Sequence, residues 1–182
     1  MPTVFSHTAV PIALAMGAGR SAISGRLMVA AMICSVVPDL DGLGLGYGIP
    51  YGHLFGHRGF FHSLFFALIM SGVATGAARQ LRTQPLTAFA VTSLSGLSHC
   101  LLDACTSGGL GVAFLSPFSN VRYFFPWRPI AVAPVDIIDL VSSWGLRVLR
   151  SEAAWIWAPS GLLALCIRIL RGWIHDNGEA LQ

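Results

Sequence analysis

Lysine is absent from this sequence of 182 residues, and its eleven basic side chains are all arginines, scattered singly or in pairs. Charged residues make up only 10% of the chain, against roughly 25% in ordinary soluble proteins, while hydrophobic residues make up 54%. The small net charge of +3 and the lack of a basic stripe exclude nucleic acid as an expected partner. The composition predicts instead a protein for which membrane lipid is part of the solvent.

Cysteine is scarce, and its spacing fits no disulfide or zinc framework. The four cysteines lack paired CxxC spacing and are predicted to be small buried hydrophobic residues: Cys34, Cys100, Cys105 and Cys166. Residues 1–16 lack the basic side chain that precedes the apolar run of a secretory signal, so we expect this segment to stay as the first helix. With no internal repeat or domain boundary, we expect one domain over residues 1–182.

Apolar runs punctuated by glycine, proline and arginine predict an all-α, multi-pass transmembrane helical bundle. The expected helices cover residues 7–19, 27–37, 60–78, 85–106, 135–149 and 153–170. Pro38 ends the second of these, which leaves Asp39 and Asp41 in the turn beyond it. The long segment 108–134 is rich in glycine, proline and aromatic residues mixed with arginine, a composition typical of a membrane interface.

Three polar clusters interrupt the apolar pattern, at 38–41, 57–63 and 98–103. Alternating the helices through a membrane brings all three to one end of the bundle, with His7 beside them if the first two helices form a hairpin. His99 and Asp103 are four residues apart and so project from one helix face, one turn apart. His57 and His62 are five apart and would share a metal only if His57 lies in the loop before the helix.

The arginines give the bundle an orientation. The opposite end is predicted to collect Arg20, Arg26, Arg79, Arg82, Arg147 and Arg150. By the positive-inside tendency that end is cytoplasmic, which puts the polar clusters on the periplasmic side. Arg168 and Arg171 would then lie outside, so the last helix is expected to re-enter the membrane or lie along its surface.

The carboxylates are concentrated in the clusters. Before position 136 the only acidic residues are Asp39, Asp41 and Asp103. Burying each of them requires a cation, which is either a metal ion or an arginine. Imidazole together with carboxylate suits zinc, and also manganese or iron, in a centre of one or more ions.

Other interpretations of the polar residues stay open. Arg58 pairing with an aspartate would make the clusters a buried ionic network without metal, and Asp39 would then be only a turn residue. Asp136 and Asp139 are expected to cap a helix. We interpret His53 and His175 as hydrogen-bonded core residues rather than ligands.

Taken together, these motifs resemble a known family. A histidine near the N-terminus, Pro-Asp-Leu-Asp, His-Arg-Gly-x-x-His-Ser, a later His-x-x-x-Asp and Pro-Phe-Ser, spread over roughly residues 7–128, resemble the YdjM family of bacterial inner-membrane metal-dependent hydrolases. This family is also described as LexA-binding, although nothing in the chain looks like a docking surface for a soluble regulator. The resemblance implies a multi-pass protein of the bacterial inner membrane, grouped with the zinc-dependent phospholipase C and nuclease superfamily. It implies a metal site at His7, Asp39, Asp41, His57, His62, His99 and Asp103.

We therefore expect a membrane-bound hydrolase that cleaves an ester or phosphoester of a lipid-linked substrate with a metal-activated water. An aspartate not used as a ligand, Asp39 or Asp41, would be the general base. Guanidinium groups bind phosphate oxygens in a fork, and the candidates for such a clamp are Arg58, Arg122 and Arg128. Trp127 would hold the acyl region.

Two other functions compete with this one. Intramembrane carboxylates and histidines also form ion pathways, so a divalent-cation or proton transporter is the first alternative. Ligands near helix ends rather than the bilayer midplane favour the hydrolase. The second alternative is a non-catalytic membrane scaffold held together by a buried ionic network.

Overall fold

A computed structural model describes residues 1–134 and 137–179 of the chain. The elements in chain order are α1 (Val4–His7), α2 (Ala9–Ala18), α3 (Gly25–Val36), the 3-10 turn η1 (Val37–Gly42), α4 (Leu43–Gly46), the 3-10 turn η2 (Phe60–His62), α5 (Leu64–Gly76), α6 (Pro85–Ala104), the 3-10 turn η3 (Ile137–Val141), α7 (Ser143–Glu152), the π-helical turn η4 (Ala153–Trp157) and α8 (Ala158–Glu179). The described residues contain isolated β-bridges but no strand, which confirms the all-α bundle.

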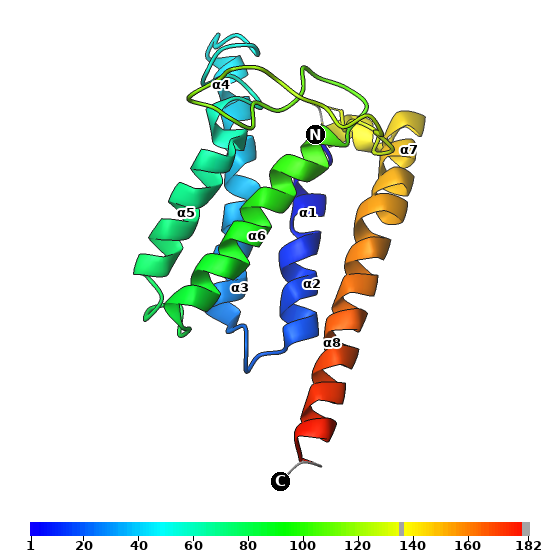
Figure 1. The fold of residues 1–182 in the computed structure, drawn as a ribbon. Coiled ribbons are helices and arrows are strands. Elements are labelled where there is room, and N and C mark those ends of the chain that lie inside the picture. The colour runs from blue at the N-terminus through cyan, green and yellow to red at the C-terminus, as the bar shows by residue number, and fades with distance from the viewer. Residues whose placement is uncertain (135–136, 180–182) are drawn as a thin grey trace.

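The helices stand side by side as a bundle, with the connecting loops at its two ends (Figure 1). By length and composition, three helical stretches can cross a membrane: Gly25–Gly46, Pro85–Ala104 and Ser143–Ile174. The shorter apolar helices Val4–Ala18 and Leu64–Gly76 accompany them. α6 packs against both α3 and α5, and α2 packs against α8. Large apolar side chains are exposed along the outer faces, as expected for a surface that lipid covers.

Serine caps set three helix starts, and all three differ from the expected boundaries. Ser24 caps α3, and Ser63 caps α5 by accepting a hydrogen bond from the Phe66 amide. Because Ser63 is extended, α5 begins at Leu64 rather than at residue 60. Ser142 caps α7, so the helix expected over 135–149 is divided into η3 and α7. Asp136 lies outside the described residues.

After Pro38 the chain stays helical instead of forming an irregular turn. Asp39 and Asp41 lie on η1, and α4 follows within the segment expected to be a loop. The 3-10 geometry of η1 has three residues per turn, so Asp39 and Asp41 point in different directions from one short turn. Asp39 and Asp41 therefore contact different groups in the candidate site.

The last helix runs along the length of the bundle (Figure 1). The expectation that it re-enters the membrane or lies along the membrane surface was wrong. α7, η4 and α8 run as one helical stretch, with α7 beside the loops at one end of the bundle and α8 reaching the other (Figure 1). At that far end Arg171 donates a hydrogen bond to Ser21. Arg147 and Arg150, on α7, therefore lie at the end opposite to the one expected. The cause is the long segment before α7, because it keeps the chain at the end of the bundle where α6 finishes.

The segment between α6 and α7 covers one end of the bundle. The Leu64 amide donates to the Phe114 carbonyl, and the Ala113 amide donates to the Arg58 carbonyl. At the end of the segment the Ala133 amide donates to the Met1 carbonyl. These bonds hold an otherwise irregular stretch over the helix ends that carry the polar clusters.

The prediction that all four cysteines are buried is confirmed for only two of them. Cys34 and Cys100 are buried, whereas Cys105 is partly buried and Cys166 is exposed. Cys166 differs because α8 contacts the bundle along one face only, where Ala164 packs against Gly17, and its remaining faces are open. All four are free thiols, so none serves a disulfide.

Candidate metal centre

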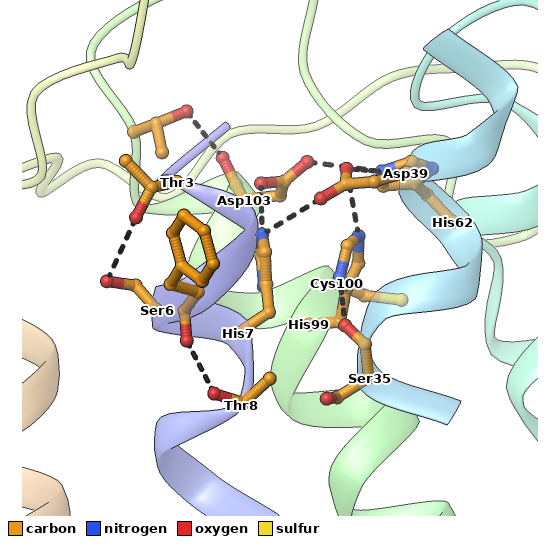
Figure 2. Close-up of polar contacts among 12 residues, drawn as sticks. Thr3, Ser6, His7, Thr8, Ser35, Asp39, His62, His99, Cys100 and Asp103 are labelled. Carbon is orange, nitrogen blue, oxygen red and sulfur yellow. Dashed lines mark hydrogen bonds and ion pairs between the residues drawn. The ribbon is translucent and has the colours of Figure 1, made fainter. Parts of the chain in front are cut away.

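The predicted ligands meet at the end of the bundle covered by the long segment, as Figure 2 shows for most of them. Each comes from a helix end or a short turn. The contributing side chains are His7 at the end of α1, Asp39 and Asp41 on η1, His57 in the following loop, His62 at the end of η2, and His99 and Asp103 on the last turns of α6. The helix alternation thus brings the three clusters and His7 together as expected.

Two carboxylates and three imidazoles face one another at nearly uniform spacing. His7 Nε2 lies 3.6 Å from Asp39 and 3.5 Å from Asp103. His62 Nε2 lies 3.5 Å from Asp39 and 3.3 Å from Asp103, and His99 Nε2 lies 3.6 Å from Asp39. Most of these distances are too long for good hydrogen bonds. They match the separation of about 3.3 Å between ligand atoms around a tetrahedral ion with metal–ligand bonds of about 2.0–2.1 Å.

The same atoms are buried and lack hydrogen-bond partners among the described residues. Nε2 of all three histidines and both carboxylate oxygens of Asp39 and Asp103 belong to this group. One ligand atom from each of Asp39, His62, His99 and Asp103 lies within 4.8 Å of the others. Of these atoms, Asp103 Oδ2 is also ion-paired with Arg58 Nε at 3.0 Å. Unpaired buried polar atoms are expensive, and a shared cation would satisfy the others at once. The donor set therefore fits a divalent metal ion.

The remaining ring nitrogens are used to orient two of these imidazoles. His99 Nδ1 lies 2.8 Å from the Ser35 carbonyl oxygen, and His62 Nδ1 lies 2.9 Å from Asp41. Metal-bound histidines usually donate their other N–H to a carbonyl or carboxylate in this way, which fixes the tautomer. His7 has no such partner among the described residues, and its ring stacks on His99 with centroids 3.8 Å apart.

Asp41 differs from the other two aspartates because hydrogen bonds occupy both its oxygens. One oxygen lies 2.6 Å from His57 Nδ1, and the other is contacted by His62 Nδ1 and by the Arg58 amide at 3.1 Å. His57, Asp41 and His62 also satisfy the spacing of a metal-binding group. The short distances to Asp41, however, are those of hydrogen bonds rather than of neighbouring ligands around an ion. The geometry favours Asp41 as an orienting residue and His57 as a neighbour of the centre.

Arg58 is the fixed cation of the site. Its side chain is fully buried, with Nε 3.0 Å from Asp103 and the two terminal nitrogens donating to Thr106 Oγ1 and the Gly108 carbonyl, each at 2.8 Å. Its backbone is left-handed at φ 63°, which costs energy for a non-glycine residue and is tolerated where contacts over-determine it. Since these contacts occupy its donors, Arg58 holds Asp103 rather than offering a free clamp for substrate phosphate.

Gly109 makes this arrangement of Arg58 sterically accessible. It has a positive φ of 91°, and a Cβ at this position would lie 2.9 Å from Arg58 Nη1 and 2.7 Å from the Tyr51 hydroxyl. Only a residue without a side chain lets both groups approach so closely.

The charges of the cluster do not balance without a further cation. Asp39, Asp41 and Asp103 face the guanidinium of Arg58, and the amino group of Met1 also acts on Asp39 and Asp103, so at least one negative charge stays uncompensated when the histidines are neutral. Burial alone would lower the pKa of His62, but Asp103, Asp39 and Asp41 together hold that pKa well above its usual value. The cluster thus requires either protonated imidazole or a metal ion.

Glu152 is a buried acidic residue that sequence reasoning missed. Its carboxylate accepts hydrogen bonds from the Thr3 amide at 2.5 Å and from the hydroxyls of Thr3 and Ser6, each at 2.8 Å. Trp157 completes the network by donating to Ser6 Oγ at 3.0 Å. These contacts anchor α1, the helix that carries His7, to the start of the last transmembrane stretch. The only sequence signal was an isolated acidic residue inside an amphipathic helix.

Three further residues predicted to bind substrate, Arg122, Trp127 and Arg128, make contacts outside the candidate ligand set. Arg122 donates to the carbonyls of His57, Tyr51 and His53, so it supports the loop that carries His57. Trp127 is exposed and packs edge-on against Trp155, and Arg128 is exposed over the Phe124 ring. Trp127 and Arg128 thus lie on the surface of the long segment, in positions suited to a membrane interface.

His53 and Asp139, which were not expected to bind metal, are both exposed. His53 is exposed in a loop, where its Nδ1 accepts a hydrogen bond from the Phe55 amide, so it is not a core residue. Asp139 is exposed in the first turn of η3. The side chain of His175 lies outside the described part of the structure.

A cavity of about 370 Å³ adjoins the metal centre. Its polar wall contains Asp39, Tyr51 and His57, and burial raises the pKa of the Tyr51 phenol. Its lining also includes apolar side chains, among them Leu45 and Val132. A bound molecule would therefore meet both polar groups and hydrocarbon.

Comparison with known proteins gives the same family that the motifs resemble. The family described as YdjM inner membrane protein matches residues 1–174. The chain belongs to the YdjM inner membrane protein family. A relative in this family, inner membrane protein YbcI of Escherichia coli (strain K12), is 41% identical over 164 residues, covering 90% of this chain and 95% of the relative. No solved structure matches the chain. YdjM membership and the apolar helices together identify an inner membrane protein.

Proposed function

We propose that this YdjM-family protein is a metal-dependent hydrolase that cleaves an ester or phosphoester of a membrane lipid or lipid-linked molecule. The observation that carries the proposal is the convergence of Asp39, His62, His99 and Asp103 in a buried site whose carboxylates outnumber its fixed cation. His7 completes the set from the opposite side. Zinc is the first candidate for the ion, followed by manganese and iron, because imidazole and carboxylate ligands suit all three.

A divalent ion in such a site supplies a Lewis acid and lowers the pKa of water towards neutrality. The residues of the chain then have separate tasks. His7, Asp39, His62, His99 and Asp103 would hold the ion, and Arg58 would keep Asp103 in place. Asp41 and the Ser35 carbonyl would keep two of the imidazoles turned towards the ion.

In this proposal His57, rather than Asp39 or Asp41, is the general base. Asp41 is engaged by three hydrogen-bonding groups and Asp39 by the metal-ligand set, so neither is a free base. The His57 ring lines the cavity, and its Nδ1 contacts Asp41. Its Nε2 is thus the nitrogen left to exchange a proton with a molecule in the cavity.

We further propose that the site faces the periplasm. Arg20, Arg26, Arg79 and Arg82 lie in or beside the turns at the other end of the bundle, and such turns are typically cytoplasmic. The arginines at the site end are Arg58 and Arg122, whose donors are engaged inside the protein, and the exposed Arg128, Arg147 and Arg150. The other end has more exposed arginines, because Arg171 joins the four named above.

Hydrolysis is tested with detergent-purified protein loaded separately with zinc, manganese or iron. Suitable probes are bis-p-nitrophenyl phosphate, p-nitrophenyl acyl esters and phosphatidylglycerol vesicles. We expect turnover that Asp103→Asn abolishes and the exposed control Asp139→Asn retains. If the metal-loaded protein cleaves none of these compounds but carries metal ions across vesicle membranes, the result would contradict the hydrolase proposal and support a transporter.

A further inference from the structure

A second cavity, of about 270 Å³, lies beside the cavity at the metal centre. Its lining is apolar apart from Thr3 and consists of Met1, Pro2, Thr3, Val4, Phe5, Ala133, Pro134 and Leu140. Both the amide and the hydroxyl of Thr3 are bonded to Glu152, so this residue has little hydrogen-bonding capacity left for a ligand. A cavity of this kind suits hydrocarbon rather than a polar headgroup.

The two cavities share part of their lining. Met1, Ala133 and Pro134 line both of them. The Ala133 amide donates to the Met1 carbonyl, which satisfies the backbone at the junction. A molecule lying across these shared residues would meet the polar side chains of Tyr51 and His57 in one cavity and mainly apolar side chains in the other.

The apolar cavity lies next to surface that faces lipid. Phe5, in its lining, is 68% exposed, and Val141, which directly follows the lining residue Leu140, is 89% exposed. At the end of a bundle of transmembrane helices, exposed apolar side chains of this size are favourably placed against hydrocarbon. The natural route into the cavity is therefore sideways from the bilayer, between α1 and η3.

We infer that the apolar cavity binds one acyl chain of the substrate, which makes the substrate an acyl-chain lipid that enters laterally from the membrane. The inference rests on the proposed function for the reaction, but not for the binding. The chain lies against Phe5, Ala133 and Leu140, and the bond to be cleaved lies at the polar wall formed by Asp39 and His57. The length of the chain, rather than the headgroup alone, then contributes to recognition.

The test is photo-crosslinking of the protein in phosphatidylglycerol vesicles. A trace of the phosphatidylglycerol carries a photoreactive diazirine in its acyl chain. Mass spectrometry locates the labelled residues. We expect labelling concentrated on Phe5, Ala133 and Leu140 and reduced at least about fivefold by Ala133→Phe, which fills the shared wall. The matched control is Val73→Phe, on the lipid-facing surface of α5, and it leaves the pattern unchanged.

Metal content of Ala133→Phe reports whether the site still forms, and Leu140→Trp is a second filling variant if it does not. Labelling spread evenly over the lipid-facing helices, and unaffected by both filling variants, would overturn the inference even if soluble esters are hydrolysed. Concentrated labelling without hydrolysis of any ester would support the acyl site and overturn the hydrolase. In an active protein, filling the cavity should reduce cleavage of long-chain esters while sparing short soluble ones.

Discussion

At the scale of single residues, the two aspartates of the 38–41 motif have different roles although they are two positions apart. Asp39 faces the Nε2 atoms of His7, His62 and His99, whereas Asp41 turns away to bond His57 Nδ1 and His62 Nδ1. The short 3-10 turn explains the divergence, because it rotates successive side chains by about 120°. Asp39 is thus a ligand candidate, and Asp41 supports a ligand.

Replacing Asp41 by Asn should weaken metal binding without abolishing it. The amide cannot replace the charge that keeps His62 oriented, and losing such an outer partner typically costs about 10- to 100-fold in metal affinity. Titration of apo-protein with zinc measures this directly. Asp103→Asn should instead remove binding at every accessible zinc concentration, and equal losses in the two variants would contradict the division of roles.

At the scale of elements, the metal centre depends on a contact between the two ends of the chain. His7 lacks the orienting hydrogen bond that His62 and His99 have, so its position follows from that of α1. Glu152 holds α1 through Thr3 and Ser6, which are nearly 150 positions away in sequence. The last transmembrane stretch is therefore coupled to the centre although it contributes no ligand candidate among the described residues.

Glu152→Gln should loosen α1 and lower zinc affinity by about tenfold, since a charged acceptor contributes roughly 1.5–3 kcal/mol through its hydrogen bonds. The matched control is Arg150→Gln, an exposed change on the same helix, which should leave affinity within about twofold. Zinc titration and thermal unfolding in detergent measure the two effects. Unchanged affinity in Glu152→Gln would show that His7 is positioned without this network.

The packing of α2 against α8 gives a second prediction at this scale. A Cβ at Gly17 would lie 2.7 Å from Ile167 Cβ and 2.9 Å from the Ala164 carbonyl oxygen. Gly17→Ala should therefore push the helices apart and destabilise the protein by about 1–3 kcal/mol. Gly72→Ala, where nothing lies within 4 Å, should be neutral or stabilising by up to about 1 kcal/mol. Thermal unfolding of the two variants in detergent compares them, and equal melting temperatures would refute close packing at Gly17.

At the scale of the whole molecule, the helix order alone predicts the convergence of the clusters. Because consecutive helices alternate in direction, the end of α3, the start of α5 and the end of α6 must lie together. The rare carboxylates mark the ends of α3 and α6, and His57 and His62 mark the start of α5. The placement of α7 could not be predicted, because it depends on how the irregular segment before it folds back. The roles of Arg122 and Glu152 depend on the same non-local contacts, which leave no periodic pattern in the sequence.

The orientation of the bundle is tested by cysteine labelling in intact cells, in a variant lacking the two incompletely buried thiols, Cys105 and Cys166. Phe118→Cys lies in the segment over the site and is 82% exposed in its native form, whereas Gln80→Cys lies at the other end. A membrane-impermeant maleimide should label Phe118→Cys in intact cells and Gln80→Cys only after lysis. The reverse pattern would place the site in the cytoplasm.

The central claim, that the polar clusters form a metal centre, is tested most directly by elemental analysis of the detergent-purified protein. We predict close to stoichiometric zinc, manganese or iron in the wild type and its loss in both His99→Ala and Asp103→Asn. His53→Ala and Asp139→Asn, which change exposed residues of the same types, should retain the metal. Wild-type protein that binds none of these metals after reconstitution would contradict the account and leave the clusters as a buried ionic network around Arg58.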